Sequence, residues 1–231
     1  MTRFLPLCLL LLLSPVFAQE PPPPLTEYEG RVIAQTMHYT GAAWLVRKKR
    51  EIEEAATLMR KELQVKPGMT ICDMGCGNGY HTLPLAAEVG EKGKILAVDV
   101  QPEMIDMLRK RITAKNITNV EPINGLYHDP KLPPDSCDLI LLVDVYHEFS
   151  HPVQMLASMR AALKKDGLLV LVEFRAEDAS VPIKVEHKMS KAQINKEMTA
   201  NGFTLKREFD GLPWQHLMFF GKAATEEKPA K

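Results

Sequence analysis

The sequence has no surplus of charge of either sign: 29 Lys and Arg residues balance 29 Asp and Glu residues, and no basic run stands out. Proteins that bind nucleic acids neutralise phosphates with clustered basic side chains, so this balance argues against a nucleic-acid partner. Cysteine is also scarce, with four residues in 231. Three of these, Cys72, Cys76 and Cys137, lie in or beside apolar segments. That placement indicates small core residues and not a disulfide framework.

The N-terminal apolar run is too short to act as a stable transmembrane anchor. Arg3 precedes it, Phe4–Leu13 form its core, and small residues end it at Ala18. This pattern predicts a signal peptide over residues 1–18, export to the periplasm or out of the cell, and no membrane anchor after cleavage. An uncleaved anchor is the alternative. A Pro-rich linker over 19–27 and a disordered polar tail over 223–231 are also expected.

A glycine-rich segment carries the clearest functional signal. Thr70–Asp73 is a short apolar run that ends in a carboxylate, Gly75, Gly77 and Gly79 alternate after it, and a helical pattern follows. This order predicts a strand, a tight turn and a helix, the context of a nucleotide-binding loop. Glycine permits positive φ and lets a ligand lie against the backbone. The longer G-x-G-x-x-G spacing of NAD-dependent oxidoreductases and the Lys-Ser/Thr of a phosphate-binding loop are both absent, which argues against those two classes.

A second carboxylate follows at the distance expected for ribose binding. Lys94–Asp99 reads as a strand that ends in an acidic residue about 20 positions after the glycines, where it can accept hydrogen bonds from both ribose hydroxyls. The segment Asp73–Gly79 resembles the first motif of the class I S-adenosylmethionine (SAM)-dependent methyltransferases, and the resemblance extends from about residue 68 to residue 221. It implies SAM as the cofactor, with the glycine loop at its methionine half, Asp99 at its ribose and Asp129 at its adenine. The residues expected at the cofactor are Asp73, Gly75, Cys76, Gly77, Asn78, Gly79, Asp99, Val100, Asp129 and Asp144.

Strand and helix patterns alternate from Met69 onward, which predicts an α/β domain over 67–222 with helices on both faces of a mostly parallel sheet. Strands are expected near 69–74, 94–99, 119–124, 137–144 and 167–174, helices near 80–90, 102–115, 151–164 and 190–201, and a hairpin over 203–209 and 214–221. The resemblance implies a Rossmann-like seven-stranded sheet of order 3-2-1-4-5-7-6 with the last strand antiparallel. Cap helices are expected over 28–66, specifically 28–38 and 44–63. In this region Tyr39, Trp44 and Arg47 either cover the cofactor or only pack.

The segment after the fourth predicted strand is the candidate for catalysis. In the family, this strand end faces both the sulfonium and the acceptor. It contains Tyr146, His147 and Glu148. A hydroxyl or amine acceptor has to lose a proton, and a histidine whose pKa lies near neutral pH can take it. His147 is therefore the predicted base, with Glu148 and Tyr146 shaping the site. The alternative is that His147 only caps the next helix.

The same segment contains His147-Glu148-x-x-His151, the H-E-x-x-H pattern of zinc metalloproteases. That motif functions within a helix, where positions i and i+4 bring both imidazoles onto one face. An apolar strand runs directly into this segment, and Pro152 disfavours a helical backbone at His151. The two histidines are therefore expected to diverge, and a protease is the least favoured function.

Further polar residues follow the later strands. Glu173, His187 and His216 are expected to line the acceptor side, where they bind a polar acceptor, hold a divalent metal, or form a solvated rim. No metal site is assigned. The favoured function is a SAM-dependent methyltransferase that methylates oxygen or nitrogen of an unidentified small molecule. A non-catalytic protein that binds SAM or another nucleoside is the alternative. The sequence carries no signal for oligomeric state, and an exported enzyme would need SAM supplied from the cytosol.

Overall fold

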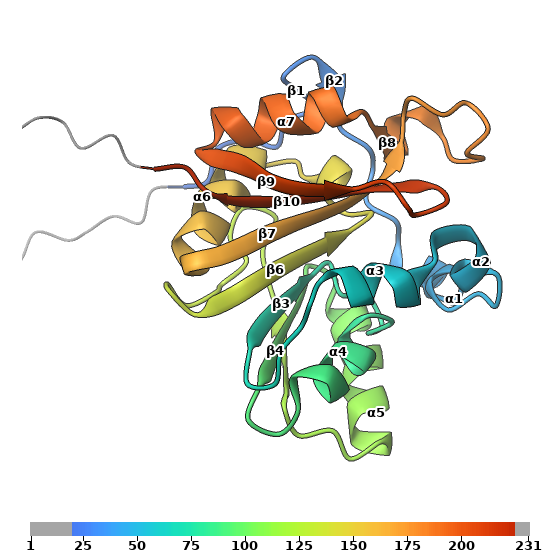
Figure 1. Cartoon of the computed structure of the whole chain (residues 1–231), viewed down its shortest axis with the longest axis vertical. Helices are drawn as coiled ribbons and strands as arrows, with labels where there is room; N and C mark the ends of the chain where they lie inside the picture. The colour runs from blue at the N-terminus through green and yellow to red at the C-terminus, as the bar shows by residue number, and fades with distance from the viewer. Residues whose placement is uncertain (1–19, 225–231) are drawn as a thin grey trace, which may run out of the picture.

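A computed structural model describes residues 20–224 (Figure 1). One mixed sheet dominates it, with seven strands in the order β5-β4-β3-β6-β7-β10-β9 and a short additional strand, β8, paired with β7. The strand bounds are β3 Thr70–Met74, β4 Lys94–Asp99, β5 Val120–Asn124, β6 Cys137–Val143, β7 Leu163–Arg175, β8 Lys188–Met189, β9 Phe203–Phe209 and β10 Gln215–Lys222. The strands from β5 to β7 are parallel, and β10 is antiparallel to both of its neighbours. When these seven strands are numbered 1 to 7 in chain order, from β3 to β10 without β8, their order in the sheet is the predicted 3-2-1-4-5-7-6. The Rossmann-like fold is therefore confirmed.

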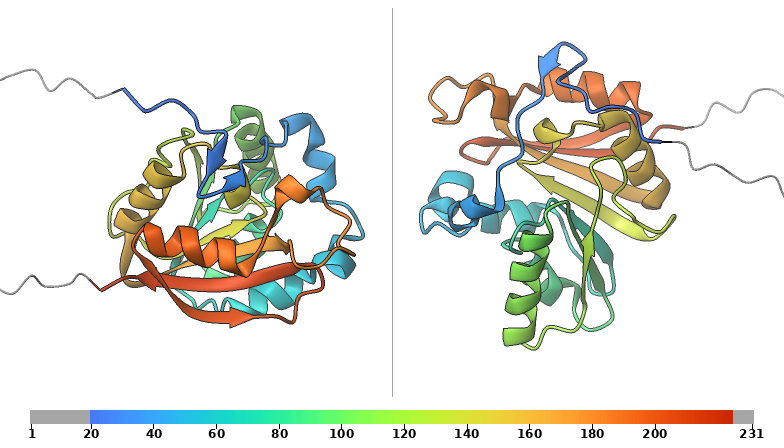
Figure 2. Two further views of the ribbon diagram at one scale, coloured as in Figure 1. Left: turned by 90° about the horizontal axis from the view of Figure 1, so that it is seen from above. Right: turned by 180° about the vertical axis from the view of Figure 1, so that it is seen from behind.

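Helices cover both faces of the sheet, as Figures 1 and 2 show. The parallel strands read as continuous apolar runs because each side of the sheet is buried under helices. One face packs on α3 (Ala56–Glu62), α4 (Thr82–Val89) and α5 (Pro102–Ala114), and the other packs on α6 (Pro152–Ala162) and α7 (Lys191–Ala200). Along β6, alternate residues belong to the two cores: Leu139 and Leu141 to the first, Ile140 and Leu142 to the second.

Local sequence signals set the helix ends. Pro102 and Pro152 each begin a helix, at the first position, where no backbone N–H is needed. Ser190 caps α7 by accepting the N–H of Gln193 at 3.1 Å. β7 begins four residues earlier than expected, at Leu163, because the segment after α6 pairs directly with Cys137 of β6.

The expected cap helices over 28–66 are only partly correct. Residues 28–38 are not helical: β1 (Glu27–Tyr28) ends at Tyr28, and after a turn β2 (Arg31–Val32) pairs with it in a two-residue antiparallel ladder. The second predicted helix is broken into α1 (Ala42–Leu45), α2 (Arg50–Glu54) and α3. Residues 46–49 separate α1 from α2, and Ala55, in a left-handed conformation with φ of 49°, separates α2 from α3. Ile52 of α2 faces solvent, and 79% of it is exposed.

Residues 20–38 run across the side of the molecule that carries α6 and α7, toward the carboxyl ends of the strands (Figure 2). Their backbone is tied to the segment after β6: Leu25 donates to the carbonyl of Ser150 at 2.9 Å and Ala34 donates to that of His147 at 3.0 Å. Arg31 forms an ion pair with Glu197 of α7 at 2.7 Å. These distant partners hold the segment extended.

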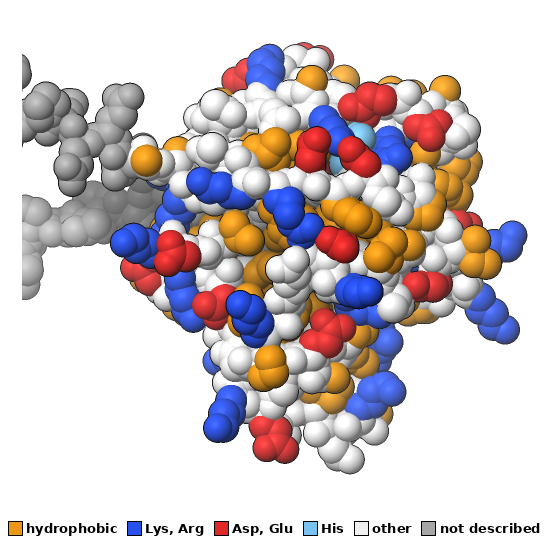
Figure 3. Space-filling view, viewed as in Figure 1, with side chains coloured by type: hydrophobic (Ala, Val, Ile, Leu, Met, Phe, Trp, Pro, Cys, Tyr) orange, Lys and Arg blue, Asp and Glu red, His pale blue; other side chains and the backbone are white. Residues whose placement is uncertain are grey.

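The predicted signal peptide and most of the predicted tail lie outside the described residues. Within residues 20–224, no helix has the length and apolar character needed to cross a membrane. On the face shown in Figure 3, basic and acidic side chains are interspersed, and no region of one sign covers it.

Candidate active site

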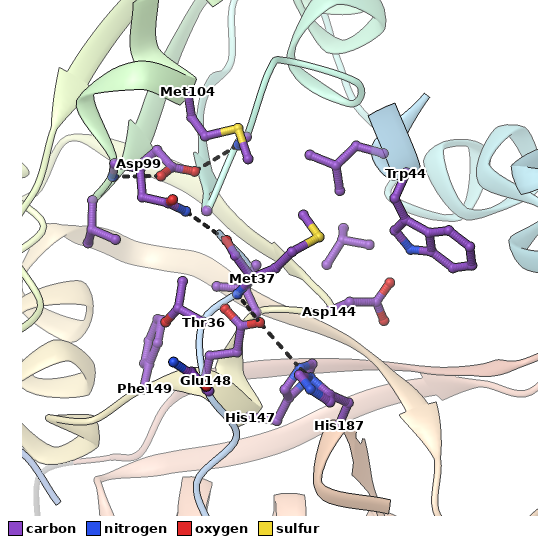
Figure 4. A pocket seen from close by; sticks show the side chains of 18 of the residues that line it. Thr36, Met37, Trp44, Asp99, Met104, Asp144, His147, Glu148, Phe149 and His187 are labelled. Carbon is purple, nitrogen blue, oxygen red and sulfur yellow. Dashed lines mark hydrogen bonds and ion pairs between the residues drawn. The ribbon is translucent and has the colours of Figure 1, made fainter. Parts of the chain in front are cut away.

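A cavity of about 760 Å³ lies at the carboxyl ends of β3, β4, β6 and β7. In open α/β sheets this edge is the usual ligand site. The volume falls in the range of about 300–1,000 Å³ that is typical of pockets for small organic ligands. Strand ends form its floor, and residues 35–38 together with α1 and α2 form part of its wall. Figure 4 shows Asp99 on one side of this cavity and the His147–His187 pair on the other.

Asp99 anchors the cofactor side. It lies at the end of β4 with a buried carboxylate, whose two oxygens accept the backbone N–H groups of Gly77 and Gln101, each at 2.9 Å. Burial raises the pKa of Asp99, and these hydrogen bonds oppose the rise. Each oxygen keeps a lone pair for a further donor. This arrangement can accept hydrogen bonds from two adjacent hydroxyl groups.

The loop that contains Gly75, Gly77 and Gly79 borders the cavity on one side and packs closely against other side chains on the other. Gly75 and Gly77 line the cavity with φ of 69° and 53°. A Cβ atom on Gly75 would lie 2.5 Å from a methyl carbon of Val145, and one on Gly77 would lie 2.5 Å from Leu45. Both positions therefore need glycine, for backbone conformation and for space.

Several residues predicted to contact the cofactor lie outside the cavity lining. Asp73 is buried beneath the loop, where it accepts the hydroxyl of Thr82 at 2.5 Å, and burial raises its pKa to about 6. Asn78 donates to the carbonyl of Ala42 at 3.2 Å. Cys76 and Gly79 also pack beneath the loop, where Gly79 has φ of 87° and faces core leucines. In the structure these four residues support the loop.

Val100 lines the cavity next to Asp99, as predicted, whereas Asp129 does not line it. The Asp129 carboxylate instead accepts the backbone N–H of Lys131 at 2.8 Å. The loop before it places Leu126 and Tyr127 at the cavity, each roughly half exposed.

Asp144 lies on the cavity wall directly after β6, in a left-handed conformation with φ of 54°. Gln215 of β10 donates to both of its carboxylate oxygens, at 2.8 and 3.0 Å. Burial, together with the negative charges of Glu54 and Glu173, raises the pKa of Asp144 well above its ordinary value. Asp144 therefore lies at the cavity, and the neutral side chain of Gln215 holds its carboxylate in place.

His147 lies between a buried carboxylate and a second imidazole. Its Nδ1 is 2.5 Å from Oε2 of Glu173, which is fully buried, and its Nε2 is 3.1 Å from Nδ1 of His187. Burial lowers the pKa of His147, but the charge and hydrogen bond of Glu173 outweigh it, and the net shift is upward. Burial and the neighbouring His147 lower the pKa of His187. The two rings come from segments 40 residues apart and meet at the cavity (Figure 4).

Glu148 completes this group. Its carboxylate lies 4.0 Å from Nε2 of His147 and accepts the backbone N–H of Met37 at 3.2 Å. Burial raises the pKa of Glu148 to about 7, although the positive charge of His147 opposes that rise. His147, Glu148 and His187 all line the cavity, and Glu173 supports them from below without lining it.

Two other predicted residues lie elsewhere. Tyr146 is fully buried and donates its hydroxyl to Glu197 at 2.6 Å, so it packs behind the site. His216 is also buried, and its Nε2 is 2.8 Å from Glu177, on the far side of β7 from the pair of imidazoles. The three histidines expected around one pocket are thus reduced to two.

The histidines of the H-E-x-x-H pattern diverge as predicted. His147 lies in a 3-10 turn, η2 (Tyr146–Glu148), whereas His151 caps α6 and its ring contacts Ser150 and the carbonyl of Pro22. The arrangement does not match a metalloprotease helix.

The structure also identifies lining residues that sequence reasoning passed over. Gln101 donates to the carbonyl of Met37 and accepts the N–H of Tyr39, so it joins the glycine side to residues 35–38. Arg50 forms a buried ion pair with Glu54 at 2.6 Å and both line the cavity. Trp44 and Arg47 do line it as considered, and Tyr39 does not. No short-range pattern in the sequence indicates Gln101. The i,i+4 spacing of Arg50 and Glu54, in contrast, is visible in the sequence.

Comparisons with known proteins agree with this geometry. The pattern of the methyltransferase domain family matches residues 65–220, and the chain belongs to that family. A demethylmenaquinone methyltransferase of Listeria monocytogenes is 26% identical over 113 residues, 49% of this chain and 48% of the relative. A protein-L-isoaspartate O-methyltransferase of Methanococcoides burtonii is 31% identical over 111 residues, 47% of this chain and 51% of the relative. The matches span about half the length of these curated relatives.

Among solved structures, a SAM dependent methyltransferase from Aquifex aeolicus has the same fold. It superimposes with a TM-score of 0.75 over 80% of this chain and 98% of that one, at 24% sequence identity. The chain therefore belongs to the methyltransferase domain family and has the fold of a SAM-dependent methyltransferase.

Proposed function

We propose that the protein transfers the methyl group of SAM to an oxygen or nitrogen atom of a small-molecule acceptor. The observation that carries the proposal is that one cavity joins a ribose-binding carboxylate, Asp99, to a carboxylate-supported imidazole pair, His147 and His187. The first feature fits the cofactor, and the second fits an acceptor that has to lose a proton.

When bound, SAM would supply a methyl group on a sulfonium sulfur, and that sulfur would keep the electron pair of the carbon–sulfur bond as the acceptor takes the methyl group in line with it. The glycine loop and Asp99 line the end of the cavity where the cofactor would bind. The acceptor proton passes to the imidazole pair, where His187 shares it with Nε2 of His147. Glu173 fixes the other nitrogen of His147 and stabilises the positive charge that the pair acquires.

The walls of the cavity favour a small acceptor with an apolar part. Tyr127, Phe149, Met155 and Phe174 line it alongside the polar groups. Residues 35–38 close one side of the cavity, which limits the size of an acceptor that enters. These features support a small molecule over a macromolecular surface.

The test is a SAM-dependent release of S-adenosylhomocysteine across a panel of phenols, catechols, amines and carboxylic acids. Calorimetry first establishes that SAM and S-adenosylhomocysteine bind. An acceptor is then expected to give turnover that His147→Ala lowers by about 10²–10⁴-fold, the usual contribution of a positioned base, while SAM affinity stays unchanged. Absence of binding by both nucleosides would refute the enzyme proposal. Binding without turnover on any acceptor would favour the non-catalytic SAM-binding alternative.

We also propose that the protein functions outside the cytosol, since residues 1–18 have the charged start, apolar core and small-residue end of a signal peptide. N-terminal sequencing of the protein from fractionated cells tests this. A mature terminus at Gln19 in the exported fraction supports it, and an intact Met1 in the cytosolic fraction contradicts it.

A further inference from the structure

We propose that His147, His187 and Glu148 form a binding site for one divalent transition-metal ion on the acceptor side of the cavity. Among residues 20–224, these three make up the one group whose potential ligand atoms all lie within 4.8 Å of one another. Two imidazoles and one carboxylate on one wall are a donor set used by zinc and by non-haem iron.

The distances fit a shared ion. Ligand atoms bound to one ion at about 2.0–2.2 Å lie roughly 3–3.5 Å apart. Nε2 of His147 and Nδ1 of His187 are 3.1 Å apart, so these nitrogens are already placed. Oε1 of Glu148 is 4.0 Å from Nε2 of His147 and has to approach by less than about 1 Å. Its hydrogen bond from the N–H of Met37, at 3.2 Å, lies at the long end of the normal range.

The hydrogen bond between Glu173 and Nδ1 of His147 is of the kind that orients metal-binding histidines. A histidine that binds a metal through one nitrogen commonly donates its other N–H to a carboxylate, which fixes the tautomer and the plane of the ring. Glu173 makes this contact with Nδ1 of His147 at 2.5 Å and is itself held by the backbone N–H of Tyr146 at 2.9 Å. The lone pair of Nε2 is thereby directed at His187 and Glu148.

The donor set selects the kind of ion. Magnesium and calcium prefer oxygen ligands, whereas imidazole suits zinc, iron, nickel and copper. Three protein ligands leave a position open toward the cavity, because all three residues line it. An oxygen or nitrogen of the acceptor would take this position. That last statement rests on the proposed function, but ion binding itself requires neither SAM nor turnover. The ion and the proton shared by the two rings occupy the same lone pairs, so they are alternatives.

The experiment titrates untagged, chelator-treated protein with Zn²⁺ by calorimetry and with Co²⁺ by visible absorption. One ion per chain is expected. His187→Ala and Glu148→Gln each remove a ligand and should weaken binding more than Glu173→Gln, which removes only support and costs about 10–100-fold. His38→Ala is the matched control, since His38 lines the same cavity but lies outside the group.

Binding of one ion that the ligand variants lose and His38→Ala keeps would support the proposal. No binding of either ion, or equal binding by the wild-type protein and both ligand variants, would overturn it. SAM titration of the same samples separates the two proposals: SAM binding without ion binding refutes only the metal site, and ion binding without SAM binding refutes only the proposed function. Circular dichroism of His187→Ala, a half-buried residue in a short turn, verifies that lost binding is not lost folding.

Discussion

Replacement of Asp99 by alanine is the most direct test of the cofactor site. In the free protein its carboxylate accepts the N–H groups of Gly77 and Gln101, each at 2.9 Å, and each oxygen has a remaining lone pair for a ribose hydroxyl. Hydrogen bonds to a charged group contribute about 1.5–3 kcal/mol each. Two of them account for about 3–6 kcal/mol, so the Kd for SAM should rise by roughly 10²–10⁴-fold.

The assay is calorimetric titration with SAM and with S-adenosylhomocysteine, which share the ribose and should be affected equally. Asp99→Asn keeps the size of the side chain and one acceptor oxygen, so its Kd for SAM should lie between that of the wild-type protein and that of Asp99→Ala. Asp129→Ala is the control, because Asp129 lies outside the cavity and a surface change of about 0.5 kcal/mol alters Kd by only about twofold. If Asp99→Ala keeps its fold by circular dichroism and binds SAM as tightly as the Asp129 variant, the assignment of the ribose site is wrong.

Three further predictions concern the scaffold. The pKa of Asp73 is near 3.8 unfolded and about 6 folded, so its contribution is most favourable below pH 4 and is lost as pH rises through 6. Between pH 4 and 7, wild type should lose about 2 kcal/mol of stability relative to Asp73→Asn in urea titrations, and parallel pH profiles would contradict this. Ala55→Gly should raise the free energy of unfolding by about 1 kcal/mol, because Ala55 has φ of 49°, and a lower melting temperature would refute that reasoning. Gly75→Ala should lower the melting temperature and abolish SAM binding, because its Cβ would lie 2.5 Å from Val145; normal SAM titration would show that the loop can shift.

The parallel sheet was predictable because its signals are local. Lys94–Asp99 is a strand with the bounds expected from the sequence, since an apolar run, a flanking glycine and a terminal carboxylate all lie within it or beside it. The segment 28–38 was mistaken for a helix because its structure depends on partners more than 100 residues away, among them His147 and Glu197. Short-range periodicity carries no information about such partners.

The candidate site divides in the same way. Asp99 follows from strand position and spacing, and His147 follows from its place after β6. Its contact with His187 does not follow, because the loop between β7 and α7 is long and has no period that fixes where His187 lies. Likewise, the sequence places His216 at a strand start but does not reveal that its ring turns to Glu177.

The attachment of residues 20–38 to the site has a consequence for the order of assembly. Ala34 bonds to a carbonyl 113 positions later, and the partner of Arg31 is 166 residues away. Contacts of such separation form late and slow the folding of small domains. During synthesis, the part of the chain that is made first therefore has no docking surface until nearly all of the domain exists. The cavity gains this wall as one of the last events in folding, and a chain truncated before α7 would lack Glu197 as well as β9 and β10, so it should have neither the complete sheet nor a closed site.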